Sequence, residues 1–282
     1  MRAQQQRPAE GGTFGARNPV ATYFLLTFIV SWTGALVVAS PHLLRHEAPT
    51  RLTGILMFPV MLLGPSLAGI VLTRIVDGRA GLSDLFARMI RWRVPVRWYA
   101  VLVIPPALVL GVLWCLETFV STSYAPNRFL MGILFGVPAG FLEEIGWTGY
   151  AFPKMSLQRS GLAASIWLGL LWGVWHLPVI DYLGTAVPHG GYWFPFFLVF
   201  TAAMTAMRVL ISWTYSNTKS VLLAQLMHVS STGALVVFSA PRVTPRQEAA
   251  WYGVYAVVLW LAVGIVVKIF RKRLTRGQSQ SA

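Results

Sequence analysis

Residues 129–150 read FLMGILFGVPAGFLEEIGWTGY. A helix needs about 20 mostly apolar residues to cross a bilayer, and this run is long enough. It is interrupted by two adjacent carboxylic acids, Glu143 and Glu144. Because an ionisable side chain is costly in hydrocarbon, such a pair indicates a functional centre. The stretch therefore predicts a membrane span with a polar centre inside it.

Similar apolar runs occur on both sides of this one, and together they predict an all-α, polytopic membrane helix bundle. The eight expected spans are 20–40, 53–74, 98–118, 129–150, 161–182, 192–214, 220–240 and 250–270. Between the second and third, apolar and basic residues of 81–98 fall on different helical faces. This segment is expected to be an amphipathic helix on the membrane surface.

Composition supports the membrane class. Only 11% of the residues are charged and 56% are hydrophobic, whereas a soluble domain carries about a quarter charged residues. The net charge of +14 does not indicate nucleic acid binding, because the basic residues lie between apolar runs. They are read as topology signals and as contacts to anionic lipid. The single cysteine, Cys115, excludes an intramolecular disulfide.

The distribution of Lys and Arg predicts that both termini are cytoplasmic. Most of the 23 basic residues, Arg208 among them, then fall in inside segments. The expected organisation is a disordered cytoplasmic tail (1–18), one transmembrane domain (19–273) with a core at 129–240, and a second disordered tail (274–282). Arginine outnumbers lysine, as in GC-rich bacterial genomes, so we expect a multi-pass protein of the bacterial inner membrane. The basic residues expected outside are Arg45, Arg51, Arg128, Arg242 and Arg246.

Two further costly groups lie in other spans, His176 in 161–182 and His228 in 220–240. Adjacent helical residues point about 100° apart, so Glu143 and Glu144 need different roles. Two carboxyl groups so close in hydrocarbon should not both ionise easily. One glutamate could act as general base, one histidine could steer its water, and the other could donate to an oxyanion. The alternative is that these groups are only hydrogen-bonding struts between helices.

A metal interpretation is also open. Glu143, His176 and His228 could hold a zinc ion with one position left for water. The sequence lacks the His-Glu-x-x-His spacing of helical zinc proteases, so a metal-free glutamate mechanism with no cofactor is preferred. His189 is expected to be an ordinary loop residue, and Asp181, at the outer end of 161–182, is expected to be solvated.

The motifs, in this order, resemble those of the CPBP family of intramembrane proteases, which includes type II CAAX prenyl endopeptidases and bacteriocin-processing or self-immunity proteins. Glu143 and Glu144 match the Glu-Glu-x-x-x-Arg motif. His176 matches the second motif, with Trp172 in its aromatic position, and His228 matches the third. The resemblance implies that Glu143 and His176 activate water, that His228 forms part of the oxyanion hole, and that Glu144 organises the site.

The resemblance also implies an intramembrane endopeptidase acting on a membrane-associated peptide or protein. A prenylated tail, a bacteriocin leader and other membrane peptides all remain open as substrates. Two motif positions differ, since Thr148 replaces the arginine and Thr232 the asparagine. The first change is expected to leave Glu144 without a cation, and Thr232 offers a shorter donor than an amide. These departures keep open a non-catalytic self-immunity or partner-binding protein. A proton-coupled transporter is a weaker reading, because no repeated halves are visible.

Straight helices place Glu143 and His228 about eight residues from the cytoplasmic boundary and His176 about 15, a mismatch near 10 Å. A later start of the helix that carries His176 would remove the mismatch. The site is expected to open toward the cytoplasmic half of the membrane.

Overall fold

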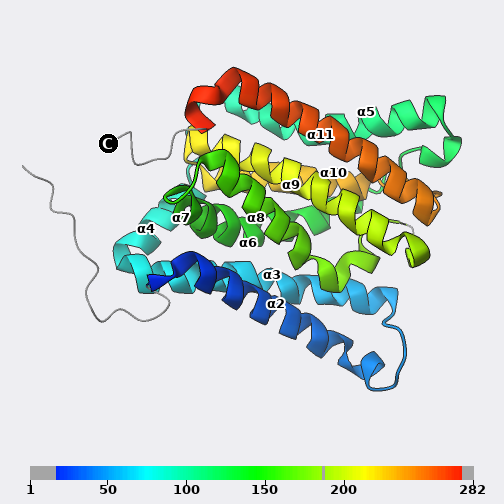
Figure 1. Ribbon diagram of the computed structural model, residues 1–282, viewed down its shortest axis with the longest axis horizontal. Coiled ribbons are helices and arrows are strands. Elements are labelled where there is room, and N and C mark those ends of the chain that lie inside the picture. Colours follow the sequence, from blue (N-terminus) through cyan, green and yellow to red (C-terminus); the bar gives the residue numbers. More distant parts are fainter. Residues whose placement is uncertain (1–16, 186–187, 275–282) are drawn as a thin grey trace, which may run out of the picture.

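The computed structural model describes residues 17–185 and 188–274 and is a bundle of long helices (Figure 1). All regular structure within these residues is helical, so the prediction of an all-α polytopic membrane protein is confirmed. The predicted tails, 1–18 and 274–282, lie almost entirely outside the described residues. Six helical segments in the described part are long and apolar enough to cross a membrane, and two further apolar helices are shorter.

The eight apolar runs are all helical. The α-helices are α2 (Pro19–Leu43), α3 (Arg51–Leu72), α4 (Gly78–Met89), α5 (Ile104–Phe119), α6 (Ile133–Gly146), α7 (Phe152–Ser156), α8 (Gly161–Trp175), α9 (Trp193–Thr218), α10 (Val221–Val237) and α11 (Pro245–Leu274). Short 3₁₀ or π segments are η1 (Thr73–Asp77), η2 (Val96–Leu102), η3 (Thr122–Tyr124), η4 (Leu130–Gly132), η5 (Trp147–Ala151), η6 (Leu177–Tyr182) and η7 (Gly190–Tyr192).

Two of the expected spans are too short to cross the bilayer alone. Helix α8 has 15 residues and α10 has 17. At 1.5 Å per residue they reach roughly 22 and 26 Å, against about 30 Å of hydrocarbon. The chain leaves α8 at His176 and continues as the 3₁₀ turn η6. The prediction of one helix over 161–182 is therefore wrong after Trp175, and His176 stands at a helix end inside the bundle.

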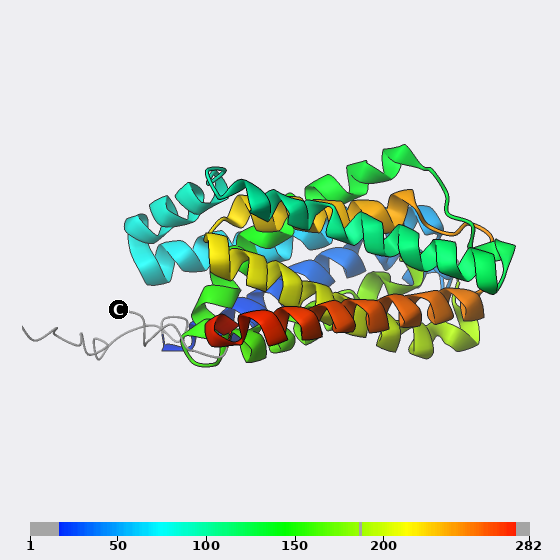
Figure 2. The ribbon, with the colours of Figure 1, turned by 90° about the horizontal axis from the view of Figure 1, so that it is seen from above.

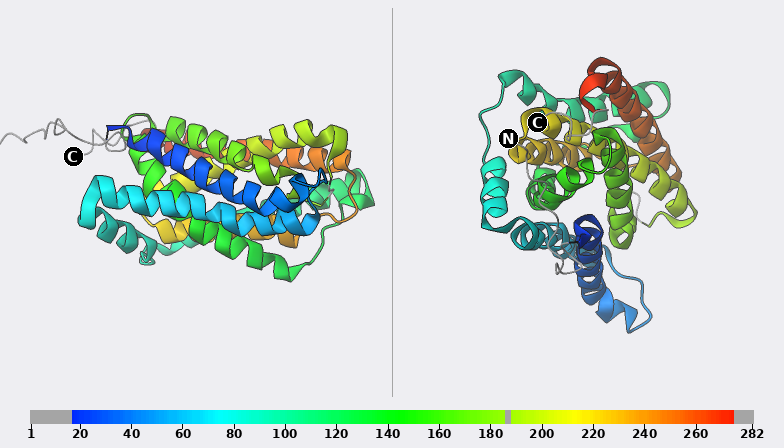
Figure 3. Two further views of the ribbon diagram at one scale, coloured as in Figure 1. Left: turned by 90° about the horizontal axis from the view of Figure 1, so that it is seen from below. Right: turned by 60° about the vertical axis from the view of Figure 1, so that its left-hand side comes forward.

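Helix α6 lies between α3 and α10, and α10 also packs on α5 and α9. Figure 3 shows α2 and α3 side by side on one side of the bundle. On the opposite side, α5 and α11 run next to each other (Figure 2). The glutamate-bearing helix is thus held on two sides by neighbours from distant parts of the sequence.

Small residues let α6 approach both neighbours at backbone distance, as is typical of membrane helix contacts. A Cβ atom at Gly140 would lie 2.6 Å from the carbonyl oxygen of Gln225 on α10. A Cβ atom at Gly146 would collide with the Pro65 carbonyl oxygen of α3 and with the Tyr23 hydroxyl of α2. Gly140 and Gly146 lie on either side of the glutamate pair, so this packing fixes the backbone that carries both carboxylates.

Replacing Gly146 with alanine should destabilise the protein by about 1–3 kcal/mol, because the new methyl group meets backbone atoms that cannot turn away. Equilibrium unfolding in mixed micelles measures the change. The control is Gly111→Ala in α5, where an added Cβ has no neighbour within 4 Å. That substitution should be neutral or stabilising by up to about 1 kcal/mol. Equal effects of the two substitutions would contradict the close contact of α6 with α3.

The predicted surface helix over 81–98 is shorter and begins earlier. Helix α4 ends at Met89, and a separate 3₁₀ segment, η2, follows. Leu85 is buried, and the Arg88 guanidinium donates to the Gly149 carbonyl oxygen at 3.1 Å and to the Tyr215 hydroxyl at 2.9 Å. This helix is therefore tied to the end of the bundle that also carries α7, the start of α2 and the end of α11 (Figure 1).

Candidate active site

Glu143 is a buried carboxylate held from one side by two tryptophans. Its Oε2 atom accepts hydrogen bonds from the indole nitrogens of Trp147 at 3.1 Å and Trp172 at 2.7 Å. Trp147 is one turn further along the same helical run, whereas Trp172 comes from α8. Because both donors use one oxygen, the other oxygen is left for the cavity that Glu143 lines. The indoles orient the carboxylate without neutralising its charge.

Glu144 points to a different set of partners, as the 100° helical offset requires. Both of its oxygens are bound by the Arg208 guanidinium, at 2.8 Å each. The Thr148 hydroxyl donates to Oε2, and the Nδ1 atom of His228 lies 2.8 Å from Oε1. Glu144, Arg208 and His228 are all at most 1% exposed. A bidentate pair of this kind is the strongest geometry available to a carboxylate and a guanidinium.

Arg208 corrects two expectations. It was counted among the cytoplasmic boundary residues, but it is fully buried about three turns before the end of α9. Glu144 was expected to lack a cation because Thr148 replaces the motif arginine. Instead α9 supplies the guanidinium, and Thr148 makes room for it and adds one hydrogen bond. The signal in the sequence was a lone arginine well inside the 192–214 apolar run, which is as costly there as the glutamates.

The two histidines are fixed through their Nδ1 atoms. Nδ1 of His176 lies 2.8 Å from the Trp172 carbonyl oxygen, and that of His228 lies 2.8 Å from Glu144. A carbonyl oxygen can only accept, so His176 carries its proton on Nδ1 and keeps a lone pair on Nε2. The Trp172 ring packs edge-on against both imidazoles, with centroids 5.7 Å from His176 and 5.1 Å from His228.

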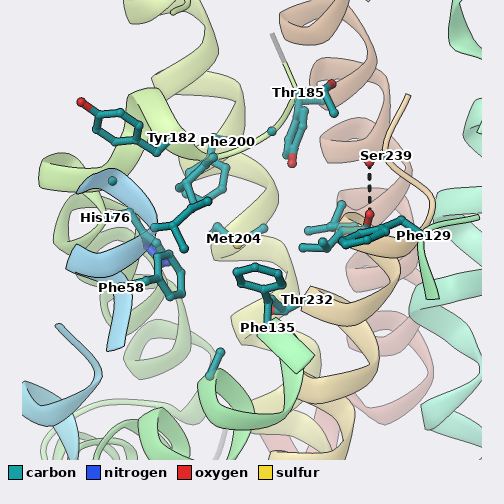
Figure 4. A pocket seen from close by; sticks show the side chains of 18 of the residues that line it. Phe58, Phe129, Phe135, His176, Tyr182, Thr185, Phe200, Met204, Thr232 and Ser239 are labelled. Carbon is teal, nitrogen blue, oxygen red and sulfur yellow. Dashed lines mark hydrogen bonds between the residues drawn. The ribbon is translucent and has the colours of Figure 1, made fainter. Parts of the chain in front are cut away.

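A single cavity of about 550 Å³ brings most of the predicted residues together. Glu143, Trp172, His176, His228 and Thr232 all line it, while Glu144 and Thr148 lie behind its wall. Figure 4 shows His176 and Thr232 facing this space from different helices, with Phe58, Phe135 and Phe200 around them. The volume falls within the roughly 300–1,000 Å³ of ligand pockets, and aromatic side chains form much of the wall.

The expected mismatch in depth does not occur, for a reason other than the predicted one. Helix α8 begins at Gly161, so there is no late start. Instead, helical structure continues from α6 through the π segment η5 and α7 to Ser156. Glu143 is therefore deeper than a helix ending near residue 150 would place it. Glu143 and His176 both contact the Trp172 side chain, so they lie at the same level of the bundle.

The cavity opens at the end of the bundle that the basic residues predict to be extracytoplasmic, whereas the sequence predicted an opening toward the cytoplasmic half, and the orientation in the membrane stays a prediction. From Glu143 the lining continues to Arg51, Asn127 and Ser239, in the connections at the other end of the bundle. No lining residue lies in α4, α7 or the turn between α9 and α10.

The zinc alternative stays a prediction. Among the residues that the structure describes, no three His, Cys, Asp or Glu side chains are grouped closely enough to hold a metal ion. The hydrogen bonds at Nδ1 leave Nε2 of each histidine available, which is also the arrangement of metal-bound histidines.

A second ionic cluster lies at the end of the bundle where the cavity is lined by Arg51, Asn127 and Ser239. His189, expected to be an ordinary loop residue, is fully buried and stacks on Phe196 at 4.1 Å. Asp181 Oδ1 lies 3.1 Å from its Nδ1, and Glu248 Oε2 lies 3.4 Å from its Nε2. Burial by itself lowers the pKa of His189, but Glu248 and Asp181 outweigh burial and raise the pKa above its ordinary value.

The stability of the protein should therefore fall as the pH rises above neutrality. A raised pKa means that the folded protein holds the His189 proton more tightly than the unfolded chain does. The stabilisation is complete below about pH 6.5, the ordinary histidine value, and is lost as the pH rises through the folded pKa. Thermal unfolding in detergent across this range measures it. His189→Gln should flatten the profile, whereas His46→Gln in the exposed loop should not. A wild-type protein that gained stability over this window would contradict the cluster.

The fold and site define an integral membrane protein that buries a glutamate-and-histidine centre inside its helix bundle. Residues 125–233, which carry all the residues of this centre, match the family model described as type II CAAX prenyl endopeptidase Rce1-like. The chain is also similar to CAAX prenyl protease 2 of Methanococcus maripaludis, with 32% identity over 112 residues, or 38% of this chain and 39% of that protein. These matches confirm the resemblance to the CPBP family over this segment. The chain thus matches less than half the length of that relative.

Proposed function

We propose that this protein is an intramembrane endopeptidase of the bacterial inner membrane that hydrolyses a peptide bond in a membrane-associated substrate. The observation that carries the proposal is the cavity onto which Glu143, His176 and His228 open from three helices. Each of these groups is costly in hydrocarbon, and one shared cavity accounts for all three. The similarity to a CAAX prenyl protease supports the same reaction class.

Glu143 is the general base in the proposed mechanism. Its free carboxylate oxygen and the Nε2 lone pair of His176 hold a water molecule between them. Glu143 takes one proton from the water as the oxygen attacks the peptide carbonyl carbon. Glu143 then gives the proton to the leaving nitrogen as the carbon–nitrogen bond breaks. The products are a new carboxyl terminus and a new amino terminus, and the base returns to its starting state.

His228 and Thr232 stabilise the negative charge that develops on the carbonyl oxygen. His228 is the first proposed donor, and its contact with the Glu144 carboxylate at Nδ1 holds the imidazole in place. Thr232 lies one turn later on α10 and also lines the cavity, so its hydroxyl is a second donor. Arg208 keeps Glu144 in place and does not touch the reacting atoms.

The test is hydrolysis by purified protein in water enriched in ¹⁸O. Membrane-associated peptides, including a prenylated tail peptide and a leader peptide, are incubated with the protein and analysed by mass spectrometry. The expected result is cleavage with one ¹⁸O atom in the new carboxyl terminus. A protein with Glu143→Gln and His176→Ala together should give none. Fragments that form equally with this double variant would overturn the proposal.

The alternative, a non-catalytic self-immunity or partner-binding protein, retains one observation in its favour, the Thr232 side chain at the motif asparagine. The same double variant discriminates between a protease and a non-catalytic protein. A non-catalytic protein would keep its protective effect in cells when Glu143 and His176 are both replaced, whereas a protease would lose it.

A further inference from the structure

We propose that peptide substrates reach Glu143 from the extracytoplasmic side of the membrane, as segments lying in the outer half of the bilayer. The proposal rests on the proposed function, because it names the substrate class and route for that site. Four observations support it. They are the end of the bundle at which the cavity opens, the packing that closes its other end, its lateral opening toward lipid, and the end of the bundle at which basic residues gather.

The cavity runs in one direction only from the buried centre. Its floor is formed by Glu143, Trp172 and His228. Its far end is lined by residues from four separate connections at one end of the bundle. These are Arg51 at the start of α3, Asn127 before α6, the segment Tyr182, Leu183, Gly184 and Thr185 after η6, and Ser239 and Pro241 after α10. Such a set forms a rim around the mouth.

The opposite end is closed by backbone packing. A Cβ atom at Gly69 of α3 would lie 2.8 Å from the Cα atom of Gly146, so the two helices touch there. The Ser66 hydroxyl donates to the Leu142 carbonyl oxygen at 2.7 Å and fastens the same contact. The Glu144–Arg208 ion pair fills the space behind the floor. A peptide could not pass from that end without separating α3 from α6.

The cavity is also open sideways, between the outer parts of α3 and α6. Ile55 and Phe135 line it from these two helices and are still 39% and 38% exposed. Phe129, just before α6, lines it and is 46% exposed. In a bilayer these surfaces face lipid. A substrate could therefore keep apolar side chains in the lipid while its backbone enters the chamber.

Charge identifies which side of the membrane the mouth faces. Short loops on the cytoplasmic side of a membrane protein carry an excess of lysine and arginine. The described basic residues at the closed end of the bundle are Arg17, Arg74, Arg79, Arg88, Arg91, Arg93, Arg97, Lys154, Arg159, Lys219 and Lys268. The mouth end carries Arg45, Arg51, Arg128, Arg242 and Arg246, accompanied by Glu47, Asp181 and Glu248. The closed end is therefore cytoplasmic and the mouth extracytoplasmic.

The substrate class follows from this geometry. The substrate is a membrane-anchored or membrane-inserted polypeptide whose scissile bond lies near the extracytoplasmic boundary. Asn127, Thr185 and Ser239 at the mouth offer polar groups to its backbone, and the phenylalanines offer surfaces to its side chains. A lipid-modified tail that stays in the cytoplasm would face the closed end.

Cysteine accessibility in cells tests the route. The native cysteine is replaced (Cys115→Ala), and single cysteines are introduced by Ala139→Cys near the floor and Ser239→Cys at the mouth. Ala206→Cys, fully buried in α9 and away from the cavity, is the matched control for Ala139→Cys. Arg79→Cys reports the cytoplasmic side. A small, charged, membrane-impermeant thiol reagent is applied to intact spheroplasts and to inverted membrane vesicles.

In spheroplasts, the cysteines at 139 and 239 should react at least about tenfold faster than the one at 206, because thiol modification follows exposure. The cysteine at 79 should react only in inverted vesicles, where those at 139 and 239 should be protected. Reaction of the cysteine at 139 from the same side as that at 79, equal reaction from both sides, or no reaction of it from either would each overturn the proposal. Labelling needs no turnover, so its failure is distinguishable from a failure of Glu143 to support hydrolysis.

Discussion

Replacing Glu143 with glutamine should lower kcat for peptide hydrolysis by about 10²–10⁴-fold, the range that a positioned general base contributes. Glutamine has nearly the same shape, and its carbonyl oxygen can still accept from the Trp147 and Trp172 indoles. It cannot take a proton from water. KM should change little, because the cavity wall that holds the substrate is unaltered. Initial rates with the purified variant, on a substrate that the wild type cleaves, measure both constants.

The matched control is Glu117→Gln, the same chemical change at a partly exposed glutamate on α5. It should leave kcat and KM as in the wild type. Circular dichroism and the elution profile in detergent should show both variants folded. A Glu143→Gln protein with wild-type kcat would mean that another group activates the water.

Replacing Arg208 with methionine should destabilise the protein by about 3–5 kcal/mol, as removal of one partner from a buried ion pair does. Methionine fills much of the space but leaves the Glu144 carboxylate buried with only the Thr148 hydroxyl and His228. Activity should fall with stability, because His228 loses the anchored carboxylate at its Nδ1 atom. Equilibrium unfolding in mixed micelles measures the first effect.

Two double variants separate charge from packing. Glu144→Gln with Arg208→Met removes both charges and should recover most of the lost stability, since the penalty comes from an unpaired charge. Arg208→Ala with Thr148→Arg returns the cation to the motif position and should recover activity as well. The control is Arg242→Met at an exposed arginine, which should leave both stability and activity unchanged. A single Arg208→Met variant as stable as the wild type would show that Glu144 does not depend on this partner.

The membrane class and the site residues could be predicted from the sequence because both depend on local rules. Long apolar runs specify spans, and ionisable groups inside them are conspicuous by their cost. Glu143, His176 and His228 were found in this way, and the structure places all three on one cavity. Their catalytic roles remain predictions.

What could not be predicted depends on contacts between distant segments. Arg208 pairs with Glu144 across 64 positions, and nothing in the apolar run around Arg208 indicates which helix it faces. The helix that carries Glu143 continues through η5, so counting residues to an assumed boundary gave the wrong depth. The direction of the cavity depends on the close contact of α3 with α6 at Gly69 and Gly146, which two separate helical patterns do not show.

The ion pair between α6 and α9 also has a consequence for how the chain is made. Glu144 emerges from the ribosome 64 residues before Arg208. At about 5–20 residues per second, roughly 3–13 s pass before its partner is synthesised. During that interval Glu144 must stay neutral or in contact with water, because a lone carboxylate is not tolerated in lipid. Helix α6 can therefore reach its final environment only after α9 has been synthesised.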